Sequence, residues 1–159
     1  MQITYNYNNH KNTFIFGSKE IISDSVLNEV RGIVKGKVDR IGGHTPFEIA
    51  INFSRYYSPE GRYGWNINKK DGWAFCFGVP DNWADNLSAC MFAHLAKHTP
   101  ILYVNPLGVP EVTKQYVLSL NPGEKHPPKS SFMHGYILGG FDKIVHKTQV
   151  ELEEILTGR

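Results

Sequence analysis

The sequence lacks any run of about eighteen apolar residues, the length that a membrane-spanning helix needs. Residues 1–12 lack the basic stretch followed by an apolar one that marks a signal peptide, and we expect them to form a flexible lead-in. The formal net charge is only +2, which by itself gives no argument for nucleic acid. We therefore expect no membrane span and no nucleic-acid partner. The chain is predicted to be either a cytoplasmic protein or a domain taken from a longer secreted one.

Cysteine is also scarce. Cys76 and Cys90 are the only two in the sequence, and two are too few for a disulfide framework or a metal-binding signature. Cys76 lies in an apolar run, and Cys90 shares a predicted helix face with Trp83, Leu87, Met91 and His94. We expect both thiols to be buried as small hydrophobic side chains, and His94 to lie at the core or its boundary. No cofactor and no metal are expected.

What the sequence does contain is an alternation of predicted strands and helices. With 41% hydrophobic and 20% charged residues in a chain of 159, it predicts a globular protein and not a disordered one. Five strands alternating with helices predict an α/β fold, an open parallel, doubly wound, three-layer αβα sheet of about five strands. The strands are expected near residues 13–17, 38–41, 72–79, 99–105 and 135–140. Ser23 is expected to cap a helix that runs to about Val34, and residues 58–71 and 121–131 are expected to form loops. We expect one domain over residues 13–157.

Residues 38–50 predict a strand, a glycine turn and the start of a helix. Thr45 suits the N-cap, Pro46 the first helical position, and Glu48 completes a capping box. One interpretation is a well-capped turn, and the other is a site for an anionic group at the helix N-terminus. Neither dinucleotide nor P-loop glycine spacing occurs here, so the stretch predicts no nucleotide site.

Four blocks of the sequence resemble the cell wall-binding repeat 2 domains of Gram-positive surface proteins. The blocks are residues 15–26 (IFGSKEIISDSV), 40–50 (RIGGHTPFEIA), 83–89 (WADNLSA) and 99–104 (TPILYV). They occur in the same order as in the family. In addition, the strand-glycine unit at residues 14–22 resembles a second unit at residues 136–144, which indicates an internal repeat. The resemblance implies an open α/β domain that binds an anionic cell-wall polymer, and a homotrimer or an excised module.

In such sheets, ligands bind beyond the carboxyl ends of the strands. In this sequence, glycine turns and polar side chains are predicted at those ends. Phosphate or carboxylate groups would meet the glycine turns, with charge supplied by Arg40 and nearby lysines. The candidate binding residues, chosen with the resemblance in view, are Arg40, Gly42, Gly43, His44, Asp81, Asp85 and Ser88.

Two alternatives stay open beside the polymer-binding module. One is a small-ligand-binding enzyme on the same fold, with Asp81 and Asp85 as carboxylates and His44 as a base. No nucleophile pairs with a base at motif spacing, and Asp85 equally suits the first turn of a helix, so we expect no catalytic residue. The other is an intracellular assembly or scaffold protein, because Pro46 stands where the family has an arginine.

Overall fold

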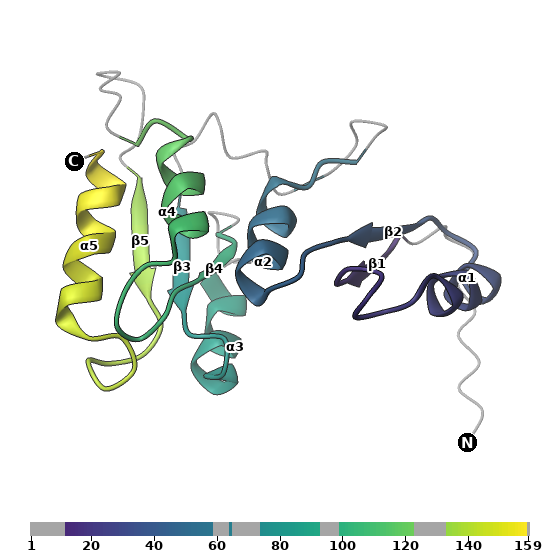
Figure 1. Cartoon of the computed structure of the whole chain (residues 1–159), viewed down its shortest axis with the longest axis horizontal. Coiled ribbons are helices and arrows are strands. Elements are labelled where there is room, and N and C mark those ends of the chain that lie inside the picture. Colours follow the sequence, from purple (N-terminus) through teal and green to yellow (C-terminus); the bar gives the residue numbers. More distant parts are fainter. Residues whose placement is uncertain (1–11, 59–63, 65–73, 93–98, 123–132, 159) are drawn as a thin grey trace. The chain divides into compact units, whose positions relative to one another are not determined.

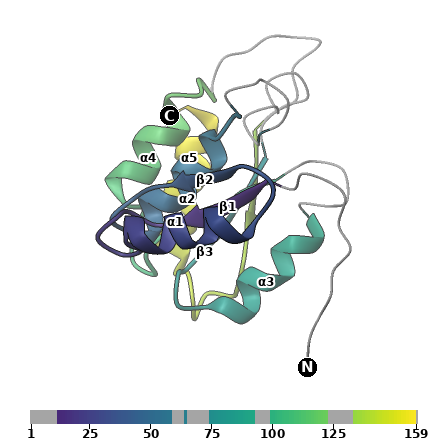
Figure 2. The same ribbon diagram turned by 90° about the vertical axis from the view of Figure 1, so that its right-hand side faces the viewer.

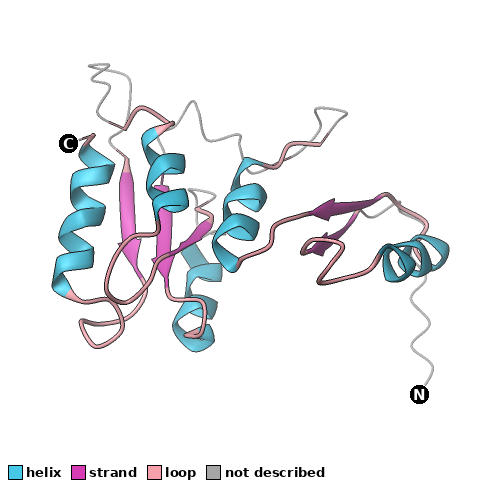
Figure 3. Cartoon of the chain, viewed as in Figure 1, coloured by secondary structure: helices cyan, strands magenta, loops and turns pink. Residues whose placement is uncertain are grey.

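The computed structural model describes residues 12–58, 64, 74–92, 99–122 and 133–158 (Figure 1). Five strands alternate with five helices over these residues (Figure 3). The order is β1 (Thr13–Phe16), α1 (Asp24–Ile33), β2 (Val38–Ile41), α2 (Pro46–Arg55), β3 (Ala74–Gly78), α3 (Trp83–Phe92), β4 (Ile101–Tyr103), α4 (Glu111–Leu118), β5 (His134–Ile137) and α5 (His146–Thr157). Every strand pair is parallel, which confirms the predicted α/β class.

The five strands are divided between two sheets, one in the order β1-β2 and the other in the order β4-β3-β5. They belong to two compact units, residues 1–44 and residues 45–159. The alternation of elements predicts parallel pairing, but it does not say which strands become neighbours. The single domain over 13–157 stays a prediction, and each unit is described below by itself.

The first unit is a two-stranded parallel sheet with one crossover helix. Thr13 of β1 lies opposite Val38 of β2, and the pairing continues to Phe16 opposite Ile41. The Ser23 side chain accepts a hydrogen bond from the Val26 N–H at 3.4 Å, so the predicted N-cap of α1 is confirmed. The core of this unit is small, with Ile15, Leu27 and Val38 as its buried members.

The second unit is organised around β3, in which all five residues are buried between β4 and β5. Because side chains alternate along a strand, Phe75 and Phe77 point to one face of the sheet and Cys76 to the other. The first face carries the main core, which α2, α4 and α5 cover. Its buried members are Ile51, Phe75, Phe77, Leu102, Val104, Tyr116, Val117, Ile144, Leu152 and Ile155.

The other face of this sheet is covered by α3, which lies across the strands from α4 and α5 (Figure 2). Its buried cluster has three members, Cys76, Ala89 and Leu138. Cys76 is therefore buried, as predicted, and burial raises the pKa of its thiol to about 11.

The prediction that Cys90 is buried is wrong, because its thiol is exposed. The other described members of the predicted apolar face of α3 are exposed as well, Trp83 by 74%, Leu87 by 62% and Met91 by 64%. The helix instead buries Asn86 and Ala89. The period of the pattern is that of a helix, but α3 is apolar on more than one side, so periodicity does not decide which side meets the sheet.

Several predictions lie largely outside the described residues: the lead-in at 1–12, His94, and the loops at 58–71 and 121–131. Within the described ranges, no helix combines the length and apolarity needed to cross a membrane.

Candidate functional site

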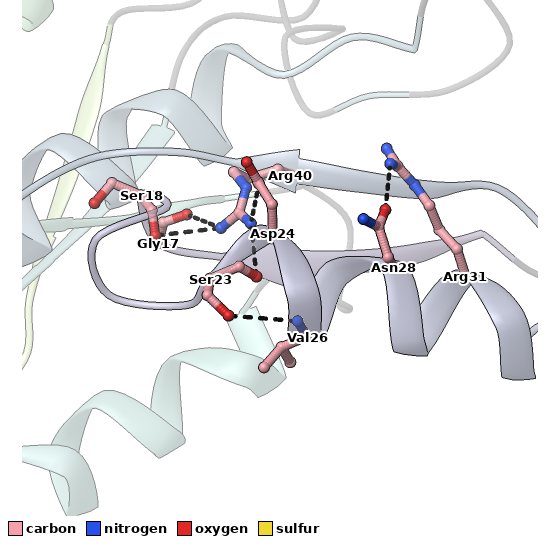
Figure 4. Close-up of polar contacts among 8 residues, drawn as sticks. All are labelled: Gly17, Ser18, Ser23, Asp24, Val26, Asn28, Arg31 and Arg40. Atoms are coloured by element: carbon pink, nitrogen blue, oxygen red, sulfur yellow. Dashed lines mark hydrogen bonds and ion pairs between the residues drawn. The ribbon is translucent and has the colours of Figure 1, made fainter.

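Arg40, a candidate anion ligand, is a residue of β2, and its side chain reaches the segment between the end of β1 and the start of α1 (Figure 4). Its Nη1 donates to the carbonyl oxygens of Gly17 at 2.9 Å and Ser18 at 3.2 Å. Its Nη2 donates to the Ser23 carbonyl oxygen at 3.4 Å and forms an ion pair with Asp24 Oδ1 at 3.1 Å. The side chain is 18% exposed. Arg40 thereby ties the carboxyl end of β1 to the first turn of α1.

These contacts limit what else Arg40 can bind. A guanidinium has two N–H groups on each terminal nitrogen, and here the two nitrogens already meet four protein acceptors. An anion that binds the two terminal nitrogens would have to displace one of these acceptors. The role of Arg40 that rests on geometry is therefore to position the β1 end and α1, while its role as an anion ligand stays a prediction.

The glycine turn that follows β2 is bonded to the turn after β1. The Gly43 carbonyl accepts a hydrogen bond from the Ser18 N–H at 3.1 Å, and Gly43 has a φ of +155°, which favours glycine. Gly42 has no such requirement, because a Cβ there would meet nothing within 4 Å. The two glycines thus have different structural roles within one turn.

His44 ends this turn beside an acidic side chain. Its Nδ1 lies 3.9 Å from Glu20 Oε2, and the two side chains are 73% and 56% exposed. The nearby Ser18 hydroxyl, and after it the backbone of Glu20 itself, lower the pKa of the Glu20 carboxyl below its usual value. Glu20 is therefore ionised at neutral pH, and its negative charge opposes an anion at this end of the turn.

The capping box of α2 is present as predicted. Glu48 N–H donates to Thr45 Oγ1 at 3.2 Å, and Thr45 N–H donates to Glu48 Oε2 at 3.0 Å. These bonds use N–H groups that a helix N-terminus would otherwise offer to an anion. The helix start is thus partly satisfied by its own side chains.

In the second unit, Asp85 lies in the first turn of α3 against the turn that follows β5. Its Oδ2 accepts a hydrogen bond from Asn82 Nδ2 and lies 3.0 Å from the position a Cβ on Gly139 would take. Ser88 Oγ donates to the Asp85 carbonyl at 2.6 Å, while Asp81 is exposed. Asp85 and Ser88 therefore lie side by side in the structure. Gly139, which is far away in the sequence, lies beside Asp85.

Asn86 is a polar residue of this edge that the sequence analysis missed. It is 6% exposed, its Nδ2 donates to the Val79 carbonyl at 2.9 Å, and its Oδ1 lies where a Cβ on Gly78 would stand. The Asn86 side chain can lie there only because Gly78 has no side chain. This contact joins α3 to β3, and no local sequence motif predicts it. Asn86 fastens α3 to the end of β3.

The described residues hold no group of three or more His, Cys, Asp or Glu side chains placed to bind a metal ion. His44 belongs to the first unit, and Asp81 and Asp85 belong to the second. The candidate residues therefore form two separate sets, Arg40 to His44 at one glycine turn and Asp81, Asp85 and Ser88 at the start of α3.

Comparison with known proteins finds relatives by fold only. No family model matches the chain, and no curated protein matches it either. Its fold is similar to part of Cwp6 from Clostridium difficile, with a TM-score of 0.67 and 19% identity over 91% of this chain and 20% of that one. Cwp8 from Clostridium difficile matches with a TM-score of 0.62 and 16% identity, over 94% of this chain and 21% of that one. The chain thus spans about a fifth of the length of each.

Proposed function

We propose that this chain is a non-catalytic module that anchors a protein to an anionic glycopolymer of the cell wall. The observation that carries the proposal is the fold similarity to Cwp6 over 91% of the chain. The four sequence blocks that resemble cell wall-binding repeat 2 domains support it, because both point to cell wall proteins. On this proposal the protein acts at the cell surface.

The exposed cations beside the glycine turn of the first unit are the groups that would meet the polymer. Arg40 is occupied by four protein acceptors, whereas Lys19 and His44 are exposed. Exposed cations on a surface attract a polyanion through many weak contacts, and the attraction falls as salt rises. In this proposal Arg40 shapes the segment from Gly17 to Asp24, Lys19 supplies positive charge to the polymer, and His44 offers a polar ring beside it.

Retention on purified cell walls tests the proposal. We expect the protein to bind intact walls and to be released by high salt, and to bind poorly to walls stripped of anionic polymers. Equal retention on intact and stripped walls would overturn the polymer specificity. A double variant, Lys19→Ala with His44→Ala, should lower retention several-fold, while Lys147→Ala, an exposed lysine of α5, should not.

The second part of the proposal is assembly into a homotrimer, which the family resemblance implies. The mass of the protein in solution, measured by sedimentation without cell walls, tests this part separately. A mass of three chains at micromolar concentration is expected. A single-chain mass at all concentrations up to the millimolar range would overturn it and would leave the wall-binding part standing.

A further inference from the structure

Three ionisable side chains lie on the two turns at the carboxyl ends of β1 and β2. Lys19 and Glu20 belong to the first turn and His44 to the second, and all three are exposed. The two turns are joined by a hydrogen bond from the Ser18 N–H to the Gly43 carbonyl at 3.1 Å. His44 Nδ1 lies 3.9 Å from Glu20 Oε2. We call Lys19, Glu20 and His44 the turn cluster.

The charges of the turn cluster cancel at neutral pH. Lys19 carries one positive charge, and the neutral ring of His44 carries none. The pKa of the Glu20 carboxyl lies below its usual value, first because of the nearby Ser18 hydroxyl, so this carboxylate is ionised at pH 7.5 and still at pH 5.5. At pH 7.5 the cluster therefore offers a polyanion no net positive charge.

His44 is the member of the turn cluster that gains charge when the pH falls. The ordinary charge change of a histidine lies between pH 5 and 8. The other charges of this stretch stay in place over that range, because guanidinium and carboxylate groups ordinarily keep their charge there. Arg40 is paired with Asp24 at 3.1 Å, and the Glu48 carboxylate accepts the Thr45 N–H at 3.0 Å. Acidification to pH 5.5 thus adds one positive charge to the turn cluster.

We propose that protonation of His44 converts the turn cluster from a neutral surface into one that holds an anionic polymer. The inference rests on the proposed function and adds control by pH to it. Once protonated, His44 offsets the charge of Glu20 across the 3.9 Å contact and leaves the charge of Lys19 to the polymer. Phosphodiester and carboxylate groups both stay ionised at pH 5.5, so the change in attraction comes from the protein.

Retention on purified cell walls at pH 7.5 and pH 5.5, at one low salt concentration, tests the inference. One unit charge about 4 Å from another in water changes an equilibrium about fivefold, so we expect retention to rise about fivefold at pH 5.5. High salt should reduce the rise, because both charges are exposed to solvent. Walls stripped of anionic polymers should show no rise. Circular dichroism should be the same at both pH values.

A matched pair of histidine substitutions separates His44 from the rest of the chain, which contains seven histidines. His44→Gln should lose most of the rise in retention at pH 5.5. His146→Gln is the control, because His146 is exposed in the first turn of α5 and belongs to the other unit. It should keep the rise. Equal rises in the two variants would overturn the role of His44.

A matched pair of glutamate substitutions tests the opposing charge. Glu20→Gln removes the carboxylate beside His44, so retention at pH 7.5 should rise toward the level that the unaltered protein reaches at pH 5.5. The control is Glu29→Gln, which removes the same charge from an exposed position on α1 and should leave retention at pH 7.5 unchanged. Equal gains in both variants would show that total charge decides, and would overturn the inference.

The outcomes for the unaltered protein separate the inference from the proposed function. Equal retention at pH 7.5 and pH 5.5 overturns the pH effect and leaves wall binding standing. Absence of retention at both pH values overturns wall binding, and the pH effect with it. A rise at pH 5.5 that His44→Gln removes and His146→Gln keeps supports both.

Discussion

The two compact units of this chain are each stabilised internally by a different kind of contact. The second unit has a three-stranded sheet and a main core of ten buried residues, with Phe75 and Phe77 at its centre. In residues 12–44, the described part of the first unit, there are two strands, a buried apolar cluster of three residues, and the Arg40 side chain bonded to four acceptors. Burial of apolar side chains is thus the main source of stability in the second unit. In the first unit, the polar contacts of Arg40 contribute a larger part of the stability.

This difference matters for function because the two sets of candidate binding residues belong to different units. A two-stranded sheet has little apolar area to bury, so specific hydrogen bonds have to fix its turns. In the first unit the conformation of the segment from Gly17 to Asp24 therefore depends on Arg40. In the second, the position of Asp85 depends on a helix packed on a well-buried strand.

The largest effect is expected in the core of the second unit. Phe77 is fully buried, and its ring lies 6.2 Å from that of Phe75. Phe77→Ala should lower the free energy of unfolding by about 3–5 kcal/mol, because it removes apolar contacts and leaves a cavity. Denaturant unfolding measures the change. A loss below about 1 kcal/mol would contradict the view that this unit depends on its apolar core.

The next effect concerns the Arg40 contacts of the first unit. Arg40→Met keeps much of the side-chain volume but removes the four contacts that Arg40 makes with Gly17, Ser18, Ser23 and Asp24. The Ser18 and Ser23 carbonyls keep the backbone N–H donors that they already have. We expect a loss of about 2 kcal/mol, with faster hydrogen exchange in residues 12–44 and little change in the second unit.

Arg31→Met is the matched control for Arg40→Met. Arg31 is exposed and donates one hydrogen bond, to Asn28 Oδ1 at 3.3 Å within the same helix (Figure 4). Its loss should change stability by less than about 0.5 kcal/mol. Equal effects of the two substitutions would show that the Arg40 contacts have no special part in this unit.

A smaller effect is expected at the capping box of α2. Thr45→Ala removes the hydroxyl that accepts the Glu48 N–H and should cost about 1 kcal/mol. Thr157→Ala is the control, because its hydroxyl bonds to carbonyls of the last turn of α5 and is exposed. In thermal unfolding, the Thr45→Ala variant should have a clearly lower melting temperature than the Thr157→Ala variant. The reverse order would contradict a stabilising role of the Thr45 cap.

The last prediction, which has no effect at neutral pH, is a pH dependence of stability from Cys76. Burial raises the pKa of its thiol from 9.0 to about 11 in the folded protein, so above pH 9 the unfolded chain loses this proton first. The free energy of unfolding should therefore fall as the pH rises from 9 to 11. Cys76→Ala should make this slope shallower, and Cys90→Ala should leave it unchanged. Identical slopes in both variants would contradict burial as the cause.

The sequence predicted local features that depend on residues close together in the chain. The caps of α1 and α2 at Ser23 and Thr45 are confirmed, because a capping side chain and its N–H lie within three residues of each other. The alternation of strands and helices and the parallel pairing are confirmed as well. The burial of Cys76 followed from the continuous apolar run around it.

Other features depend on contacts between residues far apart in the chain. Arg40 was predicted as an anion ligand, yet four acceptors from the segment of Gly17 to Asp24 surround its terminal nitrogens. Asn86 was missed because its place depends on the bare backbone of Gly78. Asp85 meets the Gly139 turn, which is more than fifty residues away in sequence.

By itself, the sequence determined the α/β class, the order of the elements and the start of each capped helix, because these follow from periodicity and from side chains that bond to nearby backbone. Only the tertiary structure decided the division into two sheets, the occupation of Arg40, and the side of α3 that faces the β4-β3-β5 sheet. The reason is the same in each case. A helix with apolar residues on two sides, or a guanidinium with several possible acceptors, has alternatives of similar local energy, and packing between distant segments selects one of them.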